Sequence, residues 1–262
     1  MSGEMIEQPD SASWDAQARL LGWTFVGLGI TVRLVRYLLC FPLWGDECML
    51  ADNLLDANMQ PQTYAALLEP MEHCQVAPLG YVWSVLTAVK LFGFNPWALR
   101  LVALAGGIGT LLLMRVAATR LLRPTAAMFA TGLCACAYYP IRHAVELKPY
   151  ATDMFFSAAL VTLAILWFSD ARRTRWLWAL VAVAPVAIVS SFPALFVAGG
   201  VGLGLFVAAR GLRFRGLWLP LLAYGCSLVA SFALVFFVSN SAQSARSGEQ
   251  MRGFWESSFP PS

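Results

Sequence analysis

The topology of this chain depends on residues 78–93, which read PLGYVWSVLTAVKLFG. A bilayer core is about 30 Å thick, so a helix that crosses it needs roughly 20 apolar residues. The stretch is shorter than that, and Tyr81, Ser84, Thr87 and Lys90 form a drifting polar stripe along it. This pattern favours a helix that lies at the membrane surface over one that crosses the bilayer.

The rest of the chain consists largely of apolar blocks. Of its 262 residues, 59% are hydrophobic and 13% are charged, whereas a soluble domain carries about twice that charged fraction. The blocks are residues 20–41, 78–93, 96–118, 124–141, 151–169, 176–190, 193–209 and 216–239. The apolar run 176–209 is too long for one span, so we divide it at Ser190–Pro193. Pro124 and Pro193 suit positions in the first turn of a helix. We therefore expect an all-α polytopic membrane protein.

Arginines cluster in short segments between the blocks, which is a topology signal. The net charge of +3 is too small to indicate a nucleic-acid partner. With a cytoplasmic N-terminus and residues 78–93 at the surface, seven spans remain, and the clusters within 115–123, 172–175 and 210–215 all face the cytoplasm. An eight-span arrangement with an external N-terminus also keeps these clusters inside, so the positive-inside rule leaves both arrangements open.

The seven-span arrangement predicts three regions. Residues 1–18 form a polar cytoplasmic tail, which lacks the basic start of a signal peptide. Residues 19–239 form the transmembrane module, with residues 42–95 as its first external loop, and residues 240–262 form an external segment. The expected location is a bacterial-type plasma (inner) membrane, crossed several times.

The six cysteines show no metal-type spacing. Cys48 and Cys74 share the first external loop, and either a disulfide or two free thiols fits the sequence. Cys134, Cys136 and Cys226 lie in apolar blocks, where we expect small core side chains.

One acidic pair, Asp46 and Glu47, directly follows the first apolar block. Such carboxylates are either solvated loop charges or a general base or metal ligand held at the membrane surface. His73 lies in the same predicted loop, where a solvated side chain is the alternative to a ligand. Arg33 and Arg36 fall in the outer half of the first span. A charge is costly there, so each needs a carboxylate or phosphate partner or snorkels outward.

A second charged segment, residues 142–153, reads RHAVELKPYATD. Pro149 is expected to start the next helix. Asp153 then lies in the first turn, where the helix dipole favours an anion, and Tyr150 shares its face.

The cations of this segment have two interpretations. Arg142 and Lys148 beside a helix N-terminus would suit a phosphate. The alternative is internal pairing, in which Lys148 binds Glu146 or Asp153.

The order of these motifs resembles that of the GT-C superfamily of membrane glycosyltransferases. Residues 44–47 (WGDE) look like the acidic motif of their first external loop, and residues 146–153 (ELKPYATD) like the second acidic motif of bacterial members. Residues 77–81 (APLGY), 91–93 (LFG) and 98–100 (ALR) look like their Pro-Pro-Leu helix, its turn and a following arginine, with Ala77 in place of the first proline. The pattern is most similar to that of the protein O-mannosyltransferase-like and aminoarabinose-transferase-like enzymes, often called family 39. It covers nearly the whole chain.

The resemblance implies a module of seven spans with two surface helices in the first external loop. It also implies a sugar donor carried on polyprenyl phosphate and a lipid, glycan or protein acceptor on the external face, with inversion at the sugar. By this likeness Asp46 is the catalytic base, Glu47 supports it, and Glu146 and Asp153 are acids of a second motif.

The expected site follows from this resemblance together with the positions of the charged residues. The catalytic set is Asp46, Glu47 and Glu146. The substrate-binding set is Lys148, Tyr150, Asp153, Arg100, His73 and Arg142, with Lys148 and Arg100 as candidates for the lipid phosphate. The candidate ligands for a divalent metal ion are Asp46, Glu146 and His73, although no spacing fixes a geometry.

Two other functions remain as alternatives. A transporter or flippase of lipid-linked sugar fits the membrane setting, but there is no convincing internal repeat, and apart from Arg33 the charges lie at span ends. An inactive scaffold left by truncation would share every feature above. Members of the superfamily commonly extend further, with more spans and an external domain, so residues 240–262 are expected to be a shortened end.

Overall fold

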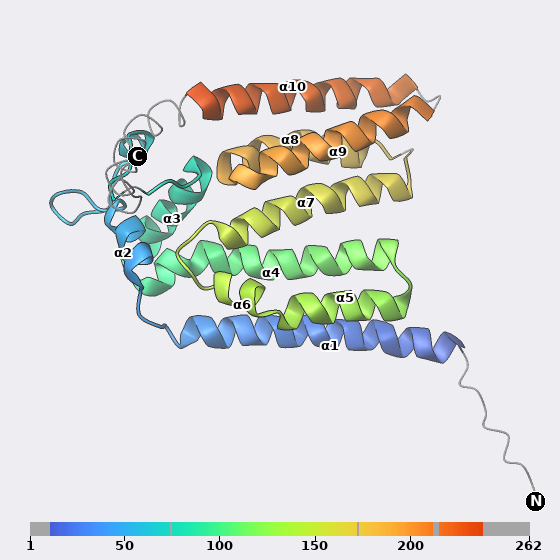
Figure 1. Ribbon diagram of the computed structural model, residues 1–262, viewed down its shortest axis with the longest axis horizontal. Helices are drawn as coiled ribbons and strands as arrows, with labels where there is room; N and C mark the ends of the chain where they lie inside the picture. The colour runs from blue at the N-terminus through green and yellow to red at the C-terminus, as the bar shows by residue number, and fades with distance from the viewer. Residues whose placement is uncertain (1–10, 74, 172, 212–214, 238–262) are drawn as a thin grey trace, which may run out of the picture.

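The computed structural model describes residues 11–73, 75–171, 173–211 and 215–237, whose longer helices lie side by side in a row (Figure 1). Across the row the order is α1, α5, α4, α7, the pair α8 and α9, and α10. Apart from one β-bridge between Leu55 and Pro61, the regular structure within these ranges is helical. The helices are α1 (Ser11–Leu38), α2 (Gly45–Asp52), α3 (Leu79–Phe92), α4 (Pro96–Leu121), α5 (Pro124–Cys136), α6 (Tyr138–His143), α7 (Tyr150–Ser169), α8 (Arg175–Ser190), α9 (Phe192–Gly211) and α10 (Trp218–Val235), with 3-10 turns η1 (Ala66–Leu68) and η2 (Arg215–Leu217).

Five of these helices, α1, α4, α7, α9 and α10, are long and apolar enough to cross a membrane. The prediction of an all-α protein with membrane-length helices is therefore confirmed. The number of crossings is not, because α5 has 13 residues and α8 has 16, fewer than the roughly 20 that a crossing needs. Seven spans remain a prediction.

Large apolar side chains cover the outward faces of the row. Phe196 is 80% exposed, Leu133 is 74% exposed and Leu203 is 66% exposed. Soluble monomers rarely leave contiguous apolar surface of this extent uncovered. In a bilayer these side chains would contact hydrocarbon, where their exposure carries no cost.

The cysteines are less buried than the sequence suggests. Cys136 and Cys226 are exposed and Cys134 is partly buried, so the expectation of three core cysteines is wrong. Cys48 is a free cysteine, and its proposed partner Cys74 lies outside the described residues. Most of the predicted cytoplasmic tail and all of the predicted external end also lie outside them, because the structure does not describe residues 1–10 and 238–262.

The predicted span 124–141 is divided at Ala137, which corrects the sequence interpretation. Ala137 has an extended backbone (φ −64°, ψ 133°) that ends α5 and starts α6. The side chain of Arg33, 1% exposed, donates to the carbonyls of Cys134 (3.2 Å) and Ala135 (3.3 Å) as well as Gly29 (2.9 Å). The last carbonyls of a helix lack partners within it and carry partial negative charge. Arg33 thus binds the end of α5 rather than a carboxylate or phosphate.

Several other predicted boundaries are confirmed. The long apolar run breaks at Ser191, between the end of α8 and the start of α9. Pro124 occupies the first turn of α5, and Pro193 is the second residue of α9. Pro149 directly precedes α7, whose first turn contains Asp153.

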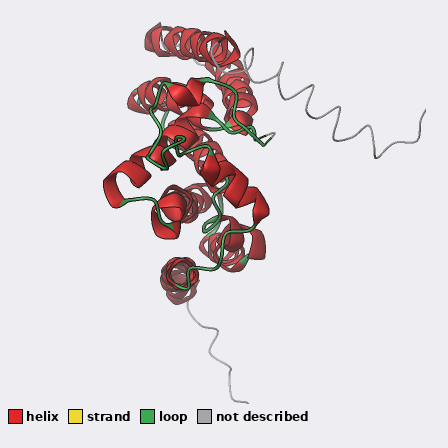
Figure 2. Cartoon of the chain, turned by 90° about the vertical axis from the view of Figure 1, so that its left-hand side faces the viewer, coloured by secondary structure: helices red, strands yellow, loops and turns green. Residues whose placement is uncertain are grey.

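Helix α3 lies with α2 at one end of the row, beside the long helices rather than among them (Figure 1). Figure 2 faces this end, where the loops gather in front of the long helices. The predicted polar stripe is partly wrong, because Tyr81 is 1% exposed and packs in an apolar cluster with Leu50, Leu86 and Leu147. The loop that follows α1 is therefore joined by apolar contacts to the segment that precedes α7.

The ends of α4, α7 and α9 and the starts of α5, α8 and α10 lie at the opposite end, together with the start of α1 (Figure 1). These helix ends, the basic turns of the row, carry arginines of all three clusters, among them Arg120, Arg175 and Arg210. Asp46 and Lys148 lie together at the α2 end. The acidic segments therefore share one end of the row and the basic turns share the other, as the seven-span arrangement requires.

Gly107 of α4 allows the segment before α7 to approach closely. A Cβ at this position would collide with the Cβ of Ala144 and lie 3.2 Å from its Cα. We expect Gly107→Ala to lower the free energy of unfolding in detergent by about 1–3 kcal/mol through overpacking. Gly27→Ala is the matched control, because nothing lies within 4 Å of its Cβ position. Equal thermal midpoints for the two variants would contradict this close contact.

Candidate functional site

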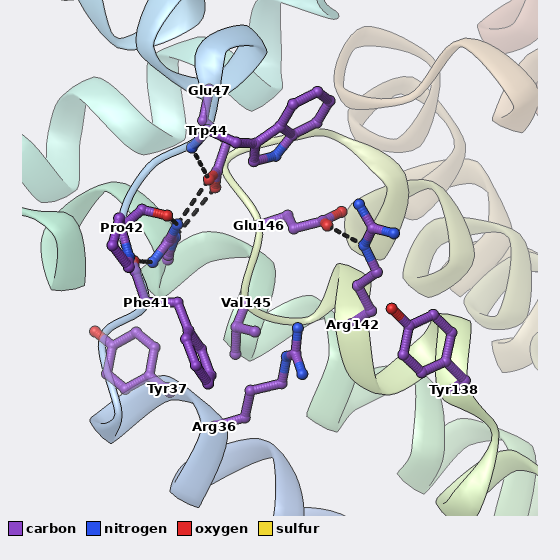
Figure 3. A pocket seen from close by; sticks show the side chains of 11 residues that line it. Arg36, Tyr37, Phe41, Pro42, Trp44, Glu47, Tyr138, Arg142, Val145 and Glu146 are labelled. Carbon is purple, nitrogen blue, oxygen red and sulfur yellow. Dashed lines mark hydrogen bonds and ion pairs between the residues drawn. The ribbon is translucent and has the colours of Figure 1, made fainter.

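The carboxylate of Glu47 holds the two acidic segments together. Its side chain is 0% exposed. It accepts hydrogen bonds from Nε and Nη2 of Arg100 (3.1 and 2.7 Å), from the Leu147 amide (2.6 Å) and from the Trp44 amide (3.3 Å). A buried carboxylate with this many donors is fully compensated. Glu47 is therefore a clamp between α2, α4 and the segment before α7 (Figure 3).

The guanidinium of Arg100 is part of this clamp. Besides Glu47, its guanidinium binds the carbonyls of Phe41 (2.6 Å) and Pro42 (3.4 Å). Only 7% of its side chain is exposed. A guanidinium occupied in this way has no free edge for a lipid phosphate, which argues against the predicted phosphate role of Arg100.

Asp46, the neighbour of Glu47, is the more open carboxylate of the pair, with 37% of its side chain exposed. Its Oδ2 lies 2.7 Å from Nζ of Lys148, and its Oδ1 accepts from Nε2 of Gln75 at 3.0 Å. Partial burial alone would raise the pKa of Asp46, but the hydrogen bonds from Lys148 and Gln75 lower it below the ordinary value. Asp46 is therefore an anion at neutral pH.

The carboxylate partner of Lys148 is thus Asp46. The two predicted pairs, Lys148 with Glu146 and Lys148 with Asp153, do not form.

Glu146 is the centre of a second charged group. It accepts from Nε of Arg142 at 2.5 Å and lies 2.6 Å from Nδ1 of His143. Burial alone would raise the pKa of Glu146, but these hydrogen bonds lower it below the ordinary value. Because α6 carries Arg142 and His143, the break at Ala137 places this group beside the Glu47 clamp.

A cavity of about 260 Å³ opens between the end of α1, α6 and the Glu47 clamp (Figure 3). It is lined by Arg36, Tyr37, Phe41, Pro42, Trp44, Glu47, Arg100, Tyr138, Arg142, Val145 and Glu146. The guanidinium of Arg36 lies 5.3 Å from the ring of Phe41, and its buried Nε has no hydrogen-bond partner within the described ranges. In the described part of the chain no ion pair involves Arg36. The cavity therefore holds a cation that can bind an anionic ligand.

Of the predicted site residues, Glu47, Arg100, Arg142 and Glu146 line this cavity, whereas Asp46, His73, Lys148, Tyr150 and Asp153 do not. The Oδ1 atom of Asp153 is buried and has no hydrogen-bond partner among the described residues. Tyr150 packs on the ring of His143 at 4.7 Å. Neither Asp153 nor Tyr150 is among the partners of the Asp46 carboxylate, which are Lys148 and Gln75.

His73 also lies apart, because it binds Asp52 at 2.9 Å. The predicted metal set of Asp46, Glu146 and His73 is not among the metal-ligand groups that the described residues form. Asp52, Glu72 and His73 instead bring their ligand atoms within 4.8 Å of one another, all of them exposed. Carboxylate and imidazole ligands of this kind could hold Zn²⁺.

Sequence reasoning missed Gln75 and Tyr138 and left Arg36 without a role. Gln75 is a neutral loop residue, and its chemical type gives no signal of a partner. Arg36 did give a signal, because an arginine in a span needs an anionic partner and the described residues supply none.

Comparison with known proteins adds no assignment to this geometry. No protein-family model, no curated protein and no solved structure matches the chain.

Proposed function

We propose that the chain is a membrane glycosyltransferase that moves a sugar from polyprenyl phosphate to an acceptor hydroxyl. The observation that supports this most is the cavity at the end of α1, where Arg36 has no anionic partner among the described residues and lies beside two carboxylate-bearing segments. A phosphate on a lipid tail is an anion that reaches a protein at the membrane edge. The tail would remain in the bilayer, against the apolar outer surface of α1.

The proposed orientation follows from the arginines. The basic turns would face the cytoplasm, in accordance with the positive-inside rule. The N-terminus would then be cytoplasmic as well, and α2, α3 and the cavity would lie on the external face of the plasma membrane. The seven-span count is part of this proposal and requires α5 and α8 to cross despite their length.

The chemistry divides between two groups of residues. An acceptor hydroxyl has a high pKa and needs a base, for which Asp46 is the candidate. Its oxygen would attack the anomeric carbon while the bond from that carbon to the phosphate oxygen breaks, with inversion. The proton would pass to Asp46 and the charge to the leaving lipid phosphate. Arg36, Arg142 and Lys148, rather than Arg100, would stabilise that charge.

Arg36→Gln tests the role of the cavity. We expect the KM for the donor to rise about 10-fold or more, because a hydrogen bond to a charged group is lost. The measurement is transfer from radiolabelled polyprenyl-phosphate hexoses and pentoses by the purified chain, with envelope extract as the source of acceptors. Arg19→Gln is the control, since Arg19 is exposed near the other end of α1. If the wild type transfers none of these sugars, the proposed function is wrong.

A further inference from the structure

Asp46, Lys148 and Gln75 form a closed triangle of contacts. Lys148 lies 2.7 Å from Asp46 and donates to Oε1 of Gln75 at 2.9 Å, while Nε2 of Gln75 donates to Asp46 at 3.0 Å. The three residues come from the first turn of α2, the loop before α3 and the segment before α7. Each carboxylate oxygen of Asp46 therefore has a donor.

This triangle suppresses the basicity of Asp46. A carboxylate that accepts a hydrogen bond from an ammonium group favours its charged form and takes up a proton less readily. The lowered pKa of Asp46 has this cause. A base that acts near neutral pH works best when its pKa lies closer to that pH. The contacts seen in the free protein are thus unfavourable for the proposed role of Asp46.

Asp46 is the more exposed end of the ion pair in this triangle. Its side chain is 37% exposed, whereas that of Lys148 is 9% exposed. Neither residue lines the cavity, but Glu47 and Glu146, which do line it, lie one residue from Asp46 and two residues from Lys148 in the chain. A phosphate that reaches Lys148 from the side of the cavity would compete with Asp46 for the ammonium group, because phosphate is a strong acceptor for such a group.

We propose that Asp46, Lys148 and Gln75 form a latch that the donor opens: the donor phosphate takes Lys148 from Asp46, and Asp46 is then free to accept the acceptor's proton. This inference rests on the proposed function. No covalent bond changes when the latch opens, since one ion pair replaces another. Gln75 is a positioning residue that keeps the carboxylate and the ammonium group aligned. The latch implies that the donor binds before the acceptor is deprotonated.

The latch makes a prediction that runs against the usual effect of removing a site residue. Because phosphate has to displace Asp46, Asp46→Asn should bind polyprenyl phosphate at least 10-fold more tightly than the wild type. Gln75→Leu should tighten binding in the same direction by a smaller factor. Glu69→Gln, an exposed position in the same loop but outside the triangle, should leave binding unchanged. The measurement is titration of each variant in detergent micelles with polyprenyl phosphate, and with polyprenol as the uncharged comparison.

The outcomes separate the two proposals. If the wild type binds polyprenyl phosphate no better than polyprenol, the proposed function fails and the latch fails with it. If the wild type prefers the phosphate but Asp46→Asn and Gln75→Leu bind it no more tightly, the latch alone is overturned.

The pH dependence of sugar transfer is a second measurement, in addition to binding. The pH at which transfer by Gln75→Leu falls on acidification should be higher than for the wild type, because Asp46 has lost a hydrogen bond that lowers its pKa.

Discussion

Glu47→Gln is expected to lower the free energy of unfolding by about 3–5 kcal/mol, the usual cost of leaving one partner of a buried ion pair uncompensated. The substitution keeps the shape of the side chain but removes the charge opposite Arg100, which has 7% of its side chain exposed. It also weakens the bond to the Leu147 amide, which fixes the segment before α7. The measurement is denaturation of the purified protein in mixed detergent micelles, followed by circular dichroism.

Two controls separate the effect of removing a buried charge from the effect of replacing the side chain. Asp52→Asn removes an exposed carboxylate that binds His73, so it should cost about 1 kcal/mol or less. The double variant Glu47→Met with Arg100→Met removes both charges, and it should cost less than the sum of the two single replacements. A cost below about 1 kcal/mol for Glu47→Gln would show that Glu47 is not a buried clamp.

Asp46→Asn is expected to reduce sugar transfer by about 10²–10⁴-fold, the range that a positioned general base contributes. The loss should appear in kcat at saturating donor, because asparagine cannot take the acceptor's proton. Folding should be preserved, since asparagine can still accept from Gln75 at the partly exposed position. Initial rates of transfer are measured for the wild type, Asp46→Asn and the control Asp52→Asn. Transfer by Asp46→Asn within a few-fold of the wild-type rate would remove Asp46 from the role of base.

Much of the fold could be predicted from local sequence. The lengths of apolar blocks and the positions of Pro124, Pro149 and Pro193 located most helix ends, because both signals act within a single turn or span. The break at Ala137 had a local signal that the sequence interpretation missed, because Pro140 cannot donate to the carbonyl four residues earlier and so disfavours one continuous helix over 124–141. The partner of the freed carbonyls could not be predicted in this way. It is Arg33, which lies about a hundred positions earlier in the sequence.

The site, like the fold, could be predicted from the sequence only in part. The topology argument correctly brought Asp46 and Glu146 to one end of the row, and the charges of the two segments were evident. The partners of those charges could not be read from the sequence. Arg100 binds Glu47, and Lys148 binds Asp46. Which cation pairs with which carboxylate depends on atomic distances within one packed region. A sequence pattern gives the charges but does not distinguish one cation from another as the partner of a given carboxylate.

The contact between Arg33 and the end of α5 also constrains how the protein is made. Arg33 leaves the ribosome about a hundred residues before the carbonyl of Cys134, a delay of about 5–20 s at ordinary rates of synthesis. Until then, an arginine within an inserted helix costs about 2.5–3.5 kcal/mol. The nascent α1 would therefore stay beside the insertion machinery or near the lipid headgroups. It would take its final position only when α5 arrives, so α1 would settle no earlier than α5 although it is made well before it.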